Sequence, residues 1–174
     1  MQTEGRAPIT SSRAHRARRL FIIFATVIFA LDLITKNWAV SYLQFREPIR
    51  VIGDFLKLTF ATNPGAAFNF ATDATLILSS LKLCVAAFLI YYTRKVTNSQ
   101  WAMALGALLG GVVGNLWDRA TREPGNWRGE VIDWIELPNW PVFNIADSAI
   151  VIAAFIAVVL TIRDISPISP KDQS

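Results

Sequence analysis

The 174-residue sequence contains a single cysteine, Cys84, and a single histidine, His15. One cysteine excludes an intrachain disulfide and any paired-cysteine metal or redox motif. One histidine, placed in a basic N-terminal segment, argues against Ser-His-Asp, Cys-His and His-Glu-x-x-His chemistry unless another chain supplies a histidine. If the protein is an enzyme, carboxylates or lysine side chains must therefore carry the reaction, with no metal or cofactor implied.

Charged residues are also scarce, at 17% of the chain, whereas hydrophobic residues reach 53%, above the usual soluble range of about 45–50%. The basic residues are segregated at the two ends and at one central hinge. Nine of the 17 Lys and Arg lie there: Arg6, Arg13, Arg16, Arg18, Arg19, Arg94, Lys95, Arg163 and Lys171. Positive charge that flanks apolar spans is typical of a membrane protein and does not indicate nucleic-acid binding.

Four apolar stretches approach the roughly 20 residues that a helix needs to cross a bilayer: 20–43, 74–92, 101–117 and 141–162. The first could be a secretory or twin-arginine signal, but no small-residue cleavage site ends it. The pattern predicts a mainly α, integral membrane protein with four transmembrane helices. We expect a basic cytoplasmic tail at 1–19, a transmembrane domain at 20–162 and a cytoplasmic C-terminal tail at 163–174.

The two long connections, 44–73 and 118–140, then face outward. In the first, Leu56, Leu58 and Phe60 alternate with polar residues, which predicts a strand and a small extracytoplasmic sheet within 44–73. Gly106, Gly110 and Gly114 predict close helix packing. We expect Lys82, inside the second span, to extend outward to the membrane surface, and residues 1–12 and 166–174 to be disordered.

Ionisable groups at a membrane span cost about 2.5–3.5 kcal/mol on insertion scales, so each is a candidate functional residue. The polar candidates fall in four groups: Asp32 with Lys36, Asn115 with Asp118, Asp133 alone, and Asn144 with Asp147. With the predicted orientation, all lie near outer helix ends and can converge on one plane.

The alternatives differ from group to group. Asp32 and Lys36, four residues apart, can form a local ion pair or take part in chemistry directly. Asp118 can pair with Arg119 to hold a helix end, or act itself. Asp133 and Asp147 have no basic residue within four positions, which favours an active role. Two carboxyls about 3 Å apart share one proton and can serve as base and acid, as in aspartic proteases.

Five motifs occur in order: Asp32-Leu33-Ile34-Thr35-Lys36, Asn63-Pro64-Gly65-Ala66-Ala67-Phe68, the segment from Gly110 to Arg119, Val131-Ile132-Asp133, and Phe143-Asn144-Ile145-Ala146-Asp147-Ser148. Together they resemble bacterial lipoprotein signal peptidase, also called signal peptidase II. The resemblance implies an intramembrane aspartic endopeptidase of the bacterial inner membrane, with both termini cytoplasmic and the site near the extracytoplasmic surface. It implies removal of signal peptides from prolipoproteins, on the amino side of a diacylglyceryl-modified cysteine.

By motif, the resemblance makes Asp133 and Asp147 the catalytic residues. The residues that bind substrate or support the site are Asp32, Lys36, Asn63, Gly65, Asn115, Asp118, Arg119, Asn144 and Ala146. Prolipoprotein and membrane lipid are the expected partners, nucleic acid is not, and a monomer is expected.

The chain departs from the family pattern at Trp134, where Phe is usual, and in a longer segment between Asp118 and Asp133. Asp118 therefore remains a rival catalytic acid. Two other classes of function stay open. Clustered aspartates can hold Mg²⁺ in a membrane phosphotransferase, and intramembrane acids also serve transporters and proton relays.

Overall fold

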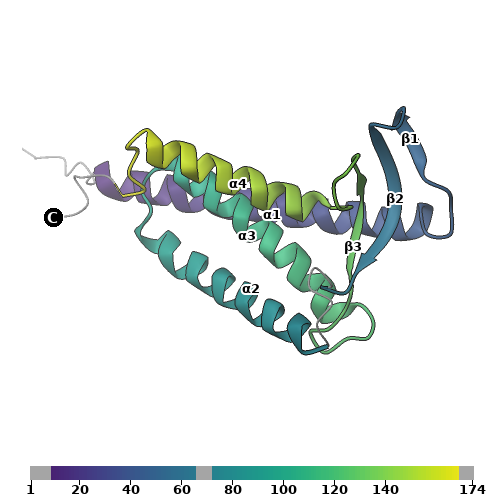
Figure 1. Ribbon diagram of the computed structural model, residues 1–174. Helices are drawn as coiled ribbons and strands as arrows, with labels where there is room; N and C mark the ends of the chain where they lie inside the picture. Colours follow the sequence, from purple (N-terminus) through teal and green to yellow (C-terminus); the bar gives the residue numbers. More distant parts are fainter. Residues whose placement is uncertain (1–8, 66–71, 169–174) are drawn as a thin grey trace, which may run out of the picture.

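The computed structural model describes residues 9–65 and 72–168. Its elements are the helices α1 (Ile9–Tyr42), α2 (Thr72–Tyr92), η1 (Thr93–Lys95), α3 (Ser99–Thr121) and α4 (Ile145–Ile162), and the strands β1 (Ile49–Ile52), β2 (Leu56–Asn63) and β3 (Val131–Glu136). The long helices run along one another, and the sheet lies at the end where α4 begins (Figure 1). The predicted class, mainly helical with a small sheet, is confirmed.

Each predicted span contains one helix, but the helices begin and end at other residues than predicted, as the fourth and the first show. The fourth helix begins at Ile145, not at 141, because the Asn144 side chain caps its first turn. The first helix begins at Ile9, so residues 9–12, which we expected to be disordered, are helical, and the basic segment 9–19 belongs to α1. The remainder of the N-terminal tail and residues 169–174 lie outside the described residues.

Glycines on α3 bring it close to α1, as the spacing predicts. A Cβ added at Gly106 would lie 2.5 Å from the carbonyl oxygen of Phe21, and one at Gly110 would lie 2.6 Å from that of Ala25. Both separations are too short for real atoms. The close approach of the two helices therefore requires glycine at these positions.

The sheet is antiparallel, with strand order β1-β2-β3. The predicted strand at 56–60 is confirmed within β2, while β1 and β3 were not predicted. The register pairs Ala61 with Asp133 and Asn63 with Val131. Asp133 therefore lies on a strand, not at a helix junction, and the pairing of β3 with β2 places Asp133 near Asn63.

Large apolar side chains cover the outside of two helices. Ile77 on α2 is 68% exposed and Phe155 on α4 is 67% exposed. Residues Thr75–Lys95 and Ile145–Ile162 are long and apolar enough to cross a membrane, by length and composition. Exposed apolar faces of this kind suit a lipid environment. The charged and amide residues described next lie on helices α1 and α3, on strands β2 and β3 and at the start of α4.

Candidate active site

The two predicted catalytic acids come from different elements and meet at one asparagine. Asp133, on β3, is 3% exposed, and Asp147 lies half-buried in the first turn of α4. The Asn144 side chain donates to Asp133 Oδ1 at 2.6 Å and accepts from the backbone N–H of Asp147 at 2.9 Å. We call Asp133 and Asp147 the acid pair. A single amide side chain therefore bonds to both residues of the pair.

Asn144 is fixed by the chain itself. It is fully buried and caps α4 in a capping box, in which the backbone N–H of Asn144 also donates to Asp147 Oδ2 at 3.4 Å. This box satisfies backbone N–H groups that a helix start leaves free. The other carboxylate oxygen, Asp147 Oδ1, accepts from Asn115 Nδ2 at 2.8 Å. The carboxyl of Asp147 is consequently held in one orientation.

The environment of Asp133 favours its neutral form. The pKa of Asp133 is raised to about 6: burial raises it most, the nearby charge of Asp147 also raises it, and hydrogen bonds from Asn63 and Asn144 act in the opposite sense. A carboxyl with its pKa near neutrality can both accept and donate a proton in the physiological range. The electrostatic effect of Asp147 also indicates that the two acids interact.

Lys36 lies at the centre of a buried polar network beneath the acid pair. Its ammonium contacts Asp32 Oδ2 at 2.7 Å, Asp118 Oδ2 at 2.9 Å and Asn115 Oδ1 at 2.9 Å. Lys36, Asp32 and Asp118 are each fully buried. Because an ammonium has three N–H donors, these partners use all of them. The local ion pair between Asp32 and Lys36 exists, but it belongs to a larger network.

The predicted pair between Asp118 and Arg119 does not form. Asp118 Oδ1 accepts from Arg122 Nε at 2.5 Å, and Asp118 Oδ2 accepts from the backbone N–H of Ile132 at 3.2 Å. Arg119 instead donates to the carbonyl of Gly129 at 2.8 Å. Asp118 thus holds the end of α3 to Arg122 and to β3. With every oxygen engaged and no exposed surface, Asp118 is a poor candidate to activate water.

The loop after β2 reaches the acid pair through Asn63. Asn63 Nδ2 lies 3.3 Å from Asp133 Oδ2, and Asn63 Oδ1 accepts from the backbone N–H of Gly65 at 2.9 Å. Gly65 has a φ of +92°, which favours glycine. Its surroundings are also tight, since an added Cβ would lie 3.3 Å from Arg119 Nη2. Residues 66–68 of this motif lie outside the described residues.

Ala146 connects the network to the start of α4. Its backbone N–H donates to Asp32 Oδ1 at 2.9 Å. A carboxylate on α1 therefore accepts a hydrogen bond from one of the N–H groups that the start of α4 leaves without a partner inside the helix. The same residue contacts α3 closely, and position 111 must be glycine there, because a Cβ on Gly111 would lie 2.5 Å from the Ala146 carbonyl oxygen.

The structure therefore brings all the predicted site residues into one connected region. It adds Arg122, which sequence reasoning did not single out, and Asn37, to which Arg122 donates at 3.2 Å. The spacing of four residues between Asp118 and Arg122 was a usable signal. Within 9–65 and 72–168, no group of three or more His, Cys, Asp or Glu is placed to hold a metal ion.

Comparison with known proteins decides the family. Residues 24–163 match the family model described as signal peptidase (SPase) II. The chain belongs to the signal peptidase II family. This match covers every residue of the site described above, and it confirms the resemblance inferred from the five motifs.

Relatives and solved structures agree with this assignment. The chain is 41% identical over 153 residues to a lipoprotein signal peptidase of Rhodococcus jostii, covering 88% of this chain and 77% of that protein. It is also 41% identical to a lipoprotein signal peptidase of Streptomyces coelicolor, covering 89% of this chain and 77% of that protein. A solved bacterial membrane enzyme superposes with a TM-score of 0.74 at 26% identity, covering 83% of this chain and 93% of that one.

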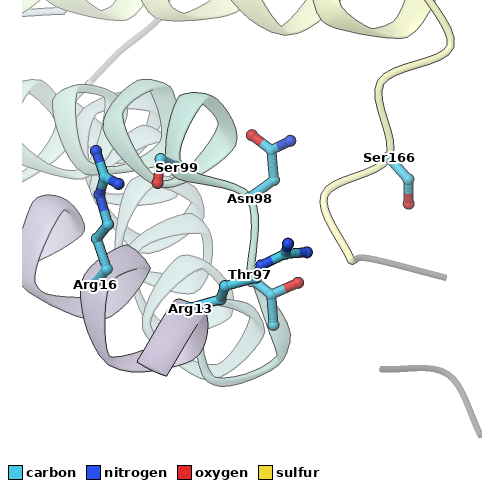
Figure 2. Close-up of a pocket in the computed structure, with 6 residues that line it drawn as sticks. All are labelled: Arg13, Arg16, Thr97, Asn98, Ser99 and Ser166. Atoms are coloured by element: carbon cyan, nitrogen blue, oxygen red, sulfur yellow. The ribbon is translucent and has the colours of Figure 1, made fainter. Parts of the chain in front are cut away.

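A separate cavity of this signal peptidase II family member lies away from the acid pair. It measures about 300 Å³ and lies between the start of α1 and the start of α3, next to Ser166 (Figure 2). Its lining residues are Arg13, Arg16, Thr97, Asn98, Ser99 and Ser166. None of the predicted site residues lines this cavity, so it has no direct part in the site.

Proposed function

We propose that this protein is an intramembrane aspartic endopeptidase that removes signal peptides from bacterial prolipoproteins. The substrate bond lies on the amino side of a diacylglyceryl-modified cysteine. The relatives named lipoprotein signal peptidase support this substrate class. The observation that carries the mechanism is the buried side chain of Asn144, which donates to the carboxyl of Asp133 and accepts from the backbone N–H of Asp147, and so fixes the two residues relative to each other.

Asp133 and Asp147 are the proposed catalytic residues. One carboxylate takes a proton from water as the water oxygen attacks the scissile carbonyl carbon. The protonated partner gives its proton to the leaving amine nitrogen as the C–N bond breaks. Two neighbouring carboxyls suit this reaction because they favour a state with one shared proton. The raised pKa of Asp133, about 6, supports such a state.

The remaining site residues take supporting roles in this proposal. Asn63, Asn115 and Asn144 orient the carboxyls through amide N–H groups and offer hydrogen bonds to a bound peptide. Asp32, Lys36 and Asp118 form the ion-paired base of the site, while Arg119, Gly65 and Ala146 fix the backbone around it. No metal or other cofactor is needed for the proposed steps.

We further propose that all four long helices span the inner membrane, with both termini in the cytoplasm. The basic start of α1 and the pair Arg94-Lys95 in the α2–α3 hinge support this orientation. The sheet and the acid pair then lie near the extracytoplasmic surface, within a transmembrane domain at 20–162 followed by a cytoplasmic tail at 163–174. Membrane lipid surrounds the domain, and the protein acts as a monomer without nucleic acid.

Asparagine variants of the two acids test the function. We expect Asp133→Asn and Asp147→Asn each to reduce cleavage of a prolipoprotein in membranes by about 10³-fold or more, as for residues that act as a unit. Asp54→Asn is the matched control, because the Asp54 side chain is 75% exposed in the turn between β1 and β2. Near wild-type cleavage by either acid variant would contradict the assignment.

Two further conditions separate the alternatives. Loss of cleavage in Asp118→Asn with full protein stability would favour Asp118 as a catalytic residue. Loss of activity in EDTA would favour the metal-dependent class, whereas the proposed mechanism predicts full activity there.

A further inference from the structure

A second cavity, of about 530 Å³, lies between the start of α1 and the end of α2. These two helix ends are at the opposite end of the bundle from the sheet and the start of α4, which hold the acid pair (Figure 1). The volume is typical of sites that bind small molecules, about 300–1,000 Å³. The walls include Arg18, Phe21 and Ile22 of α1, Ile90 of α2, and Thr93 and Arg94 of η1. The proposed mechanism uses none of these residues.

The polar and apolar walls of this cavity follow the same order on both sides. On α1, Ile22 follows Arg18 by four residues, and on the other side Ile90 precedes Arg94 by four. Because α1 and α2 run in opposite directions (Figure 1), both isoleucines lie toward the middle of the bundle and both arginines toward its end. Ile22 and Ile90 are 52% and 49% exposed, while Phe21 is buried. The cavity is therefore amphipathic along the bundle axis.

The two guanidinium groups give the cavity a positive end without a counter-charge from the chain. Arg18 and Arg94 are exposed, and neither forms an ion pair within residues 9–65 and 72–168. None of the described residues that line the cavity is Asp or Glu. A guanidinium group can bind a phosphate through two parallel N–H···O bonds. The positive end is therefore suited to a ligand that carries a phosphate.

A buried hydroxyl in the cavity wall also lacks a partner. Thr93 is 9% exposed, and its Oγ1 is buried without a hydrogen-bond partner in the described part of the chain. Buried hydroxyls in proteins are normally hydrogen-bonded. Thr93 precedes Arg94 and lines the same cavity, so a ligand oxygen held by the arginines can accept from this hydroxyl. The hydroxyl and the two guanidinium groups thus offer donors at one end of the cavity.

We propose that this cavity binds an anionic phospholipid, whose phosphate contacts Arg18, Arg94 and the hydroxyl of Thr93 and whose acyl chain lies along Ile22 and Ile90. In the proposed orientation, the arginines face the cytoplasmic surface, where anionic lipids are abundant. The isoleucines then face the bilayer, so the polarity of the cavity matches that of the lipids beside it. A free phosphate would leave the apolar walls uncovered, and the basic start of a signal peptide would be repelled by both arginines. This inference goes beyond the proposed function, because the cavity is distant from the acid pair.

Lipid binding by the purified full-length protein tests this site. In native mass spectrometry, we expect phosphatidylglycerol to bind about five-fold more tightly than phosphatidylcholine, and Arg18→Gln/Arg94→Gln to weaken phosphatidylglycerol binding about ten-fold, because two charge-assisted contacts are lost. Arg19→Gln/Arg163→Gln is the matched control. It removes two exposed arginines from the same end of the bundle but outside the cavity, and it should bind the lipid as the wild type does. Wild-type affinity in the cavity variant, or an equal loss in the control, would overturn the proposal.

Thr93→Val gives a second test with little risk to the fold, because it keeps the shape of the side chain and removes a hydroxyl that has no partner. We expect the lipid-free variant to be at least as thermally stable as the wild type and to bind phosphatidylglycerol about three-fold more weakly. Unchanged lipid affinity in this variant would overturn the proposal as well.

Two competing ligands identify the occupant. Inorganic phosphate that binds as tightly as phosphatidylglycerol would show that the cavity selects a free anion, and displacement of the lipid by a signal peptide would assign the cavity to the peptide. Either result would overturn the proposal, whereas a failure of both to displace the lipid supports it. All of these measurements report binding and not cleavage, so they are independent of whether the proposed function holds.

Discussion

Among single residues, Lys36 shows most clearly how the site is stabilised. An unpaired buried ammonium would cost several kcal/mol, but here two carboxylates and an amide oxygen surround it. These three partners come from α1 and α3. Lys36 therefore couples the packing of two helices to Asn115, whose amide orients Asp147.

Asp133 differs from Lys36 because its charged form lacks an adjacent cation. The pKa of Asp133 is raised above its ordinary value to about 6, so its neutral form stabilises the fold at low pH. That contribution is complete below about pH 4 and is lost as the pH rises through 6. A difference of this size corresponds to on the order of 3 kcal/mol.

We therefore predict that Asp133→Asn is more stable than the wild type at pH 7, by up to roughly 3 kcal/mol, and equally stable near pH 4. Asparagine keeps the oxygen that accepts from Asn144 but cannot ionise. Denaturant unfolding in detergent between pH 4 and 8 measures the effect, with Asp54→Asn as the control. A wild-type pH dependence in Asp133→Asn would contradict the prediction, because it would show that the pKa of Asp133 is the same in the folded and the unfolded protein.

At the scale of whole elements, the four long helices were predicted well, because the length of an apolar stretch can be read directly from the sequence. The 56–60 strand was also evident from its alternation. Strand β3 was not, because Val131-Ile132-Asp133-Trp134-Ile135 is an apolar run without alternation, which helices and strands share. Residues 131–136 form a strand because they pair with β2, a contact between distant parts of the chain that the local pattern does not reveal. The site likewise depends on contacts between distant parts of the chain.

For the site, sequence reasoning named the residues that the structure brings together, but only some of the contacts between them. Asp32 and Lys36 are four residues apart, so their ion pair was visible in the spacing. The contacts of Lys36 with Asn115 and Asp118 cross from α1 to α3 and depend on helix packing. Asp118 pairs with Arg122 and not with Arg119 because residues four apart share a helix face, whereas adjacent residues do not.

The packing of α3 against α1 yields a prediction about helices as units. We expect Gly110→Ala to destabilise the protein by about 1–3 kcal/mol, because the added Cβ overlaps the Ala25 carbonyl oxygen and the Ile28 side chain. Ala107→Ser, which adds one atom at a neighbouring half-buried position of α3, is the control. Thermal unfolding in detergent measures both variants. Equal stability of Gly110→Ala and the wild type would mean that α1 and α3 separate freely.

For the whole molecule, the proposed orientation assigns the two ends of the bundle to opposite sides of the membrane. The sheet lies at one end, with the β1–β2 turn at Gly53 and Asp54, and the α2–α3 hinge lies at the other (Figure 1). Basic residues lie at the hinge end, as the positive-inside rule requires of a cytoplasmic side. Cys84 is the one cysteine of the chain, which makes the orientation accessible to labelling.

In a Cys84→Ala background, a cysteine at Asp54 should react with a membrane-impermeant maleimide added to intact spheroplasts. A cysteine at Ser99, at the start of α3, should react only after the membrane is opened. Retained lipoprotein processing verifies that each variant is folded. Labelling of Ser99→Cys in intact spheroplasts, with Asp54→Cys protected, would invert the orientation and place the acid pair on the cytoplasmic side. Labelling of both from outside would rule out an odd number of spans between them, because Asp54 precedes α2 and Ser99 follows it.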